Sequence, residues 1–95
     1  MMFSRGPEML RTIEERQDRT VLMWIPAAGN NPVARYEVFR GLTPNSFEKI
    51  GQTTLGNFTD NTVQRGATYY YYVVAVDSMG MYSPASNMII STTPF

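Results

Sequence analysis

Residues 69–77, with the sequence Tyr-Tyr-Tyr-Tyr-Val-Val-Ala-Val-Asp, constrain the fold more than any other part of the chain. Aromatic and β-branched residues favour an extended strand over a helix. Strand side chains alternate between two faces, which gives one set of Tyr69, Tyr71, Val73 and Ala75 and another of Tyr70, Tyr72, Val74 and Val76. Both sets are apolar or aromatic, so both faces require cover, and a small domain can cover only one of them with its own core. We therefore predict a central β-strand.

The remaining apolar segments predict further short strands separated by turn residues. The seven expected strands cover residues 8–16, 20–25, 33–40, 46–54, 57–60, 69–77 and 82–93. The first has an irregular pattern, which favours a bulged edge strand over a helix with Met9 and Ile13 on one face. Residues 26–32 are expected to be a loop, residues 41–45 a turn, and residues 1–6 an irregular arm before a domain at 7–95. This spacing predicts an all-β, seven-stranded antiparallel sandwich of immunoglobulin-like type.

Composition limits the function. The 95 residues suffice for one domain, and eight basic residues balance eight acidic ones, so no net field attracts nucleic acid or anionic lipid. The chain has no Cys and no His, which removes the usual general base and the common nucleophile–base pairs. No apolar run is long enough for a membrane span or a secretory signal. The opening Met-Met-Phe favours a complete small protein over a module of a longer chain.

The carboxylates give no catalytic or metal-binding pattern. A glycosidase needs two acids facing each other across a cleft, whereas Asp60 and Asp77 lie at predicted strand ends, where short acids accept hydrogen bonds from the backbone. A calcium site requires several oxygen ligands within a few residues, and no Asp-x-Asp pattern occurs. We therefore predict no catalytic residue, no metal ligand, no cofactor, and binding to neither nucleic acid nor membrane.

A series of short motifs occurs in a recognisable order: Thr-Val-Leu-Met-Trp at 20–24, Tyr-Glu-Val-Phe-Arg at 36–40, Phe-Thr-Asp at 58–60, Val63-x-x-Gly66-x-x-Tyr69, Val73-x-Ala75-x-Asp77, Ser-Pro-Ala-Ser-Asn at 83–87 and Thr-Thr-Pro at 92–94. In this order and spacing the chain resembles the fibronectin type III domain, most of all its bacterial and phage versions. The resemblance implies a three-stranded and a four-stranded sheet. It also implies that the hydroxyl of Tyr69 bonds back to the backbone near residues 63–66. Arg65 and Ala67 depart from the common Pro and Thr.

The resemblance also divides the side chains into an inner and an outer set. The expected core contains Trp24, Tyr36, Val38, Tyr69, Tyr71 and Val73, with Ala75 and Ile89. Alternation then leaves seven side chains on the outer face of the larger sheet: Phe39, Tyr70, Tyr72, Val74, Val76, Met88 and Ile90. Together they would expose about 400 Å² or more of apolar surface, which predicts a protein-binding face. The alternative is that Arg35 and Glu37 mask the face, so that no partner is required.

These features predict a non-catalytic interaction or structural module. We expect a small subunit of a multi-copy assembly such as a phage virion, which would act in the virion or outside the cell without a signal peptide. Two alternatives remain open. One is an accessory or spacer module of a secreted polysaccharide-degrading enzyme. The other is a carbohydrate-binding module for host recognition, with Phe39, Tyr70 and Tyr72 stacked on sugar rings.

Overall fold

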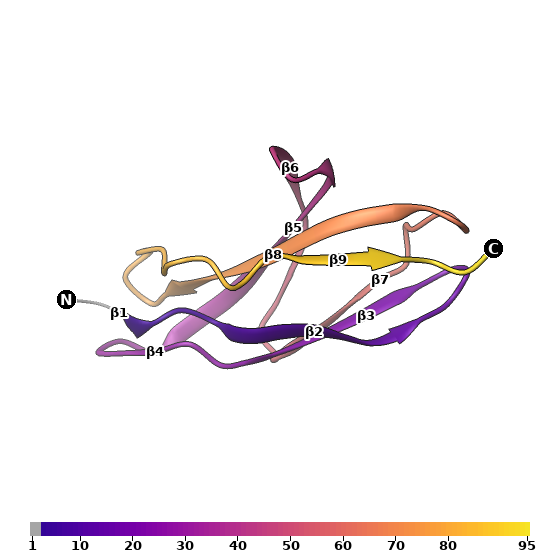
Figure 1. Ribbon diagram of the computed structural model, residues 1–95. Helices are drawn as coiled ribbons and strands as arrows, with labels where there is room; N and C mark the ends of the chain where they lie inside the picture. Colours follow the sequence, from indigo (N-terminus) through magenta and orange to yellow (C-terminus); the bar gives the residue numbers. More distant parts are fainter. Residues whose placement is uncertain (1–2) are drawn as a thin grey trace.

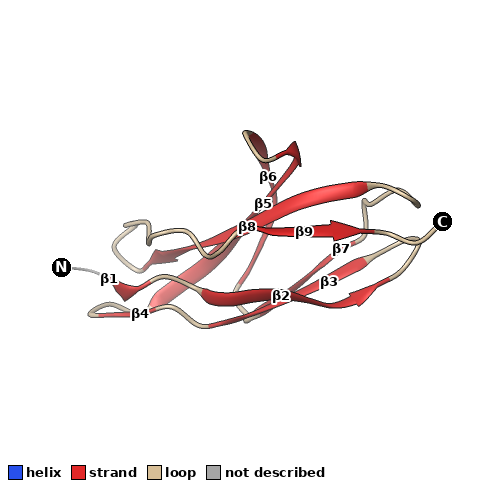
Figure 2. Cartoon of the chain, viewed as in Figure 1, coloured by secondary structure: helices blue, strands red, loops and turns tan. Residues whose placement is uncertain are grey.

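Two antiparallel sheets pack face to face in the computed structural model, which describes residues 3–95 (Figure 1). All regular structure in this range is β-strand (Figure 2). The strands are β1 (Phe3–Arg5), β2 (Glu8–Glu15), β3 (Thr20–Ile25), β4 (Ala28–Gly29), β5 (Val33–Thr43), β6 (Ser46–Thr53), β7 (Asn57–Asp60), β8 (Thr68–Asp77) and β9 (Ile89–Thr92). One sheet has the order β2-β3-β7, the other β6-β5-β8-β9, and β1 pairs with β4. The predicted sandwich is confirmed.

Strand β8 is the strand predicted from the tyrosine run, and it lies between β5 and β9 in the larger sheet. Its inward side chains pack against those of β3 and β5. Trp24 and Tyr36 meet edge to face, with ring centres 5.3 Å apart. The buried core contains Phe3, Leu10, Leu22, Trp24, Ala27, Tyr36, Val38, Val63, Tyr69, Tyr71, Val73 and Ala75. All six side chains expected at the centre are therefore buried, and Ile89 packs against them partly exposed.

The segment before β2 differs from the expectation of an irregular arm. Residues 3–5 form β1, which pairs with β4 inside the stretch expected to be a loop, and Phe3 is only 4% exposed. Burying a Phe side chain stabilises a fold by about 2–3 kcal/mol, which is enough to order a short terminal strand. Residues 1 and 2 of the expected arm lie outside the described residues.

The last expected strand, residues 82–93, is regular only from Ile89 to Thr92. Two serines explain the difference. The Ser83 and Ser86 hydroxyls accept hydrogen bonds from the backbone N–H groups of Ala75 and Val73, at 2.8 and 2.9 Å. The serine N–H groups donate to the carbonyl oxygens of the same two residues. Side chains thus replace a regular ladder beside β8, in a segment where Pro84 lacks an N–H donor.

Candidate functional site

The outer face of the larger sheet contains an aromatic cluster formed by Phe39, Phe47 and Tyr72. The rings of Phe39 and Tyr72 stack with centres 4.9 Å apart and planes 6° apart. Phe47, on β6, meets Tyr72 edge to face at 4.8 Å. Because each ring covers another, Phe39 and Tyr72 are half-buried without a partner molecule.

Val74 and Val76 were expected on the exposed outer face, and this expectation is wrong: they are 9% and 1% exposed. Glu37 lies opposite Val74 in the ladder, and Tyr82 forms an isolated bridge with Val76. The hydroxyl of Tyr82 donates to the carboxylate of Glu37 at 3.2 Å, so the Tyr82 side chain extends across β8. The side chains of Glu37, from the neighbouring strand β5, and of Tyr82 therefore lie beside these two valines on the outer face.

The carboxylate of Glu37 is the group that the other side chains over these valines contact. Arg35 approaches it at 2.9 Å and Lys49 at 3.2 Å. Burial of Glu37 disfavours its charged form, but hydrogen bonds from Arg35, Lys49 and Tyr82 outweigh that effect and hold the pKa of Glu37 below its ordinary value. Arg35 and Glu37 thus mask part of the face, as the alternative interpretation expected. Among the other residues of the predicted face, Tyr70 is half-buried, as Phe39 and Tyr72 are, while Met88 and Ile90 are 46% and 61% exposed.

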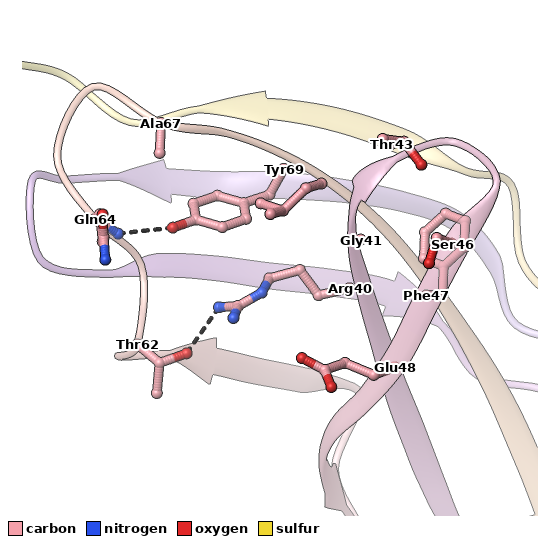
Figure 3. A pocket seen from close by; sticks show the side chains of 11 residues that line it. Arg40, Gly41, Thr43, Ser46, Phe47, Glu48, Thr62, Gln64, Ala67 and Tyr69 are labelled. Atoms are coloured by element: carbon pink, nitrogen blue, oxygen red, sulfur yellow. Dashed lines mark hydrogen bonds between the residues drawn. The ribbon is translucent and has the colours of Figure 1, made fainter.

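A cleft of about 690 Å³ lies at the end of the sandwich, between the β5–β6 hairpin and the loop from β7 to β8 (Figure 3). Arg40 and Glu48 point into it from β5 and β6, while Thr62 and Gln64 line the opposite wall. The lining also includes Gly41, Leu42, Thr43, Ser46, Phe47, Ala67 and Tyr69. Phe47 contributes both to this cleft and to the aromatic cluster.

Arg40 is held at the floor of the cleft by a buried carboxylate. Its Nη1 donates to Oδ2 of Asp60 at 2.9 Å and to the hydroxyl of Thr62 at 2.7 Å. The guanidinium carbon lies 4.7 Å from the centre of the Tyr69 ring, in a cation–π contact. The hydroxyl of Tyr69 accepts a hydrogen bond from the backbone N–H of Gln64 at 2.9 Å. This is the backbone contact that the fibronectin resemblance implied for Tyr69.

Both aspartates that the sequence placed at strand ends accept hydrogen bonds from backbone N–H groups. Asp77 accepts hydrogen bonds from the N–H groups of Met79 and Met81, both at 2.9 Å, and Asp60 accepts one from Thr62 at 3.0 Å. Within residues 3–95 no three Asp or Glu side chains lie close enough to hold a metal ion. No helix in that range could cross a membrane.

Comparison with known proteins identifies the fold family. No family model matches the chain. A crystal structure of an Fn3-like protein from Clostridium thermocellum superimposes with a TM-score of 0.78 and 29% identity, over 95% of this chain and 93% of that one. The chain is a fibronectin type III domain. In this fibronectin type III domain, Trp24 and Tyr69 occupy the core and corner positions that the resemblance implied.

Two curated relatives of this fibronectin type III domain are glycoside hydrolases. An amylopullulanase from Thermoanaerobacter thermohydrosulfuricus is 32% identical over 79 residues, which is 80% of this chain and 5% of the enzyme. Exoglucanase B from Cellulomonas fimi is 29% identical over 89 residues, which is 92% of this chain and 8% of the enzyme. The fibronectin type III domain therefore spans a small fraction of the length of either relative.

Sequence reasoning did not find the cleft. Its polar residues come from β5, β6 and the loop between β7 and β8, and no short motif connects them. Within the β5–β6 hairpin, the glycine at position 41 is a local feature that could have indicated a close approach of the two strands. A Cβ atom there would lie 2.2 Å from the carbonyl oxygen of Ser46, so only glycine allows the two strands to approach so closely.

Proposed function

We propose that this fibronectin type III domain is a non-catalytic accessory module of an extracellular polysaccharide-active enzyme, in which it acts as a rigid spacer. The observation that carries the proposal is the match to short stretches of two much longer glycoside hydrolases. The fibronectin type III fold is typically non-catalytic. The roles of Asp60 and Asp77 as hydrogen-bond acceptors for the backbone support the same conclusion.

The shape of the domain suits a spacer. The sandwich measures 44 × 24 × 19 Å. Strand β1 lies at one end of the long axis and the C-terminus at the other (Figure 1). Domains joined to the two ends would therefore be held apart by the length of the sandwich instead of folding back beside each other.

Both ends of the chain are fixed to the sandwich by contacts. The domain would therefore set the relative orientation of the domains joined to it as well as the distance between them. At one end Phe3 is part of the buried core. At the other, the backbone N–H of Gly66 donates to the carbonyl oxygen of Pro94 at 2.9 Å, and the side-chain amide of Gln17 donates to that of Phe95. A spacer held by such contacts has no hinge of its own.

Distance measurement and an activity assay test the proposal. The chain has no cysteine, so the double variant Ser4→Cys and Phe95→Cys can carry a donor and an acceptor dye at its two ends. We expect one narrow distance distribution near the 44 Å long axis. The purified chain should release no reducing ends from starch or cellulose. A broad distance distribution would overturn the spacer, and hydrolysis would overturn the non-catalytic role.

A second candidate function is docking onto another copy of the chain, in a multi-copy assembly. It is favoured by the exposed side chains of Met88 and Ile90 on the outer face, where the half-buried Tyr70 lies directly opposite Ile90. A virion is one assembly of this kind, but the two curated relatives give that setting no support. Sedimentation at rising concentration tests the candidate. Association should disappear in Ile90→Lys and persist in Ile13→Lys, which alters an exposed residue of the other sheet.

A further inference from the structure

We propose that the cleft between the β5–β6 hairpin and the β7–β8 loop binds a short segment of a neutral oligosaccharide. The choice of glycan rests on the proposed function, because both curated relatives are glycoside hydrolases. The site itself rests on the cleft in Figure 3. Its volume of about 690 Å³ lies within the range of ~300–1,000 Å³ that is typical of ligand sites.

Several polar side chains that line the cleft are free to bind a ligand. Thr62 and Asp60 bond to each other and to Arg40, so they are already satisfied. In the part of the chain that the structure describes, the side chains of Glu48, Gln64 and Ser46 have no hydrogen-bond partner. They are a carboxylate acceptor, an amide that donates and accepts, and a hydroxyl. Sugar hydroxyl groups both donate and accept, so this mixture suits them.

The charge of the cleft favours an uncharged ligand. The ion pair with Asp60 neutralises Arg40, which leaves Glu48 as the one lining charge without an ion-pair partner among residues 3–95. An acidic sugar or a phosphate would meet this negative charge without a free cation to offset it. A neutral glycan would meet no such repulsion.

The lining of the cleft also includes apolar side chains. The ring of Tyr69 has Arg40 over one face, and the second aromatic side chain of the lining, Phe47, has a ring contact with Tyr72 but no cation over it. Leu42 lies in the same hairpin and is largely exposed. A pyranose ring has apolar C–H groups on its faces, which pack favourably against an aromatic ring. Neighbouring polar and apolar groups on one wall fit such an amphipathic ligand.

The floor of the cleft is fixed before ligand binds. Arg40 is fixed by Asp60, Thr62 and Tyr69, and Gly41 allows the close approach of the two hairpin strands. A preformed floor reduces the conformational entropy that the site loses on binding. We therefore expect measurable affinity from a few contacts.

An NMR titration of the full chain tests the inference, with maltohexaose and cellohexaose as the two probes. We expect backbone amide shifts confined to residues 40–48 and 62–69 with at least one probe. Glu48→Gln keeps the shape of the side chain but removes one acceptor oxygen and the charge, so it should weaken binding about tenfold. The matched control Glu8→Gln changes an exposed acid outside the cleft and should leave binding unchanged.

Two outcomes would overturn the inference. One is the absence of shifts with both probes at millimolar concentration. The other is a set of shifts on the outer face around Tyr70 and Ile90, which disappears in Tyr70→Ala and persists in Glu48→Gln. Neither outcome touches the spacer proposal, because the distance between the chain ends and the hydrolysis assay do not depend on glycan binding.

Discussion

Arg40 and Asp60 form an ion pair across the two sheets of the sandwich, with Nη1 and Oδ2 2.9 Å apart. Arg40 belongs to β5 in the four-stranded sheet and Asp60 to β7 in the three-stranded sheet. The hydroxyl of Tyr71, on β8, donates to the same carboxylate oxygen at 2.7 Å. One buried acid therefore joins both sheets and fixes the guanidinium at the floor of the cleft.

The first prediction is that the two partners of this pair differ in their importance for stability. Asp60→Asn leaves Arg40 without its counter-charge and should lower the free energy of unfolding by about 3 kcal/mol. Arg40→Met should cost less, because Thr62 and Tyr71 still donate to the carboxylate. Urea denaturation monitored by the fluorescence of Trp24 measures both. An equal or larger loss in Arg40→Met would contradict this description.

The second prediction concerns the loss of stability at low pH. Burial of Asp60 disfavours its charged form, but hydrogen bonds from Thr62, Tyr71 and Arg40 outweigh that effect and hold its pKa below the ordinary value of 3.8. An acid whose pKa is lower in the folded state stabilises the fold above pH 3.8, and this contribution is lost as the pH falls through the folded-state pKa. The difference in Tm between the natural chain and Asp60→Asn should therefore shrink between neutral pH and about pH 2. A constant difference over that range would exclude this linkage.

The third prediction tests the cover over Val74 and Val76. Tyr82→Phe removes only the hydroxyl, with its hydrogen bond to Glu37, and should cost about 1 kcal/mol. Tyr82→Ala also removes the ring and should cost more, since the valines then meet water. Thermal unfolding gives the order of the two variants. If Tyr82→Ala is as stable as Tyr82→Phe, the ring does not shield the valines.

The fourth prediction concerns the hairpin beside the cleft. Gly41→Ala places a methyl group 2.2 Å from a backbone oxygen of Ser46, so the strands must separate. We expect a loss of more than about 2 kcal/mol. In the control Gly56→Ala, the nearest atom lies 3.5 Å away, which is ordinary contact, and stability should change little. Equal stability of the two variants would show that the two strands of the hairpin can separate at little cost in free energy.

Some elements could be predicted from the sequence because their signal is local. Strands β3 and β7 have the bounds that their apolar and turn residues predicted, and the tyrosine run of β8 lies in the predicted central strand. Other segments could not be predicted this way. Phe3 enters the core from a stretch without a strand pattern, and Ser83 and Ser86 replace the ladder that apolar residues near the C-terminus suggested.

The sequence by itself determined that β8 has two apolar faces. Side chains along a strand alternate between its faces with a period of two residues, and both alternating sets of β8 are apolar. Only the tertiary structure decided what covers the outer face, since the hydroxyl of Tyr82 meets Glu37 across 45 residues of chain. The same holds for the cleft, where Glu48 and Gln64 come together through the turn of the hairpin and the path of the β7–β8 loop. Alternation along a strand depends on neighbouring residues, whereas contacts between distant residues depend on register and loop path, which no local pattern contains.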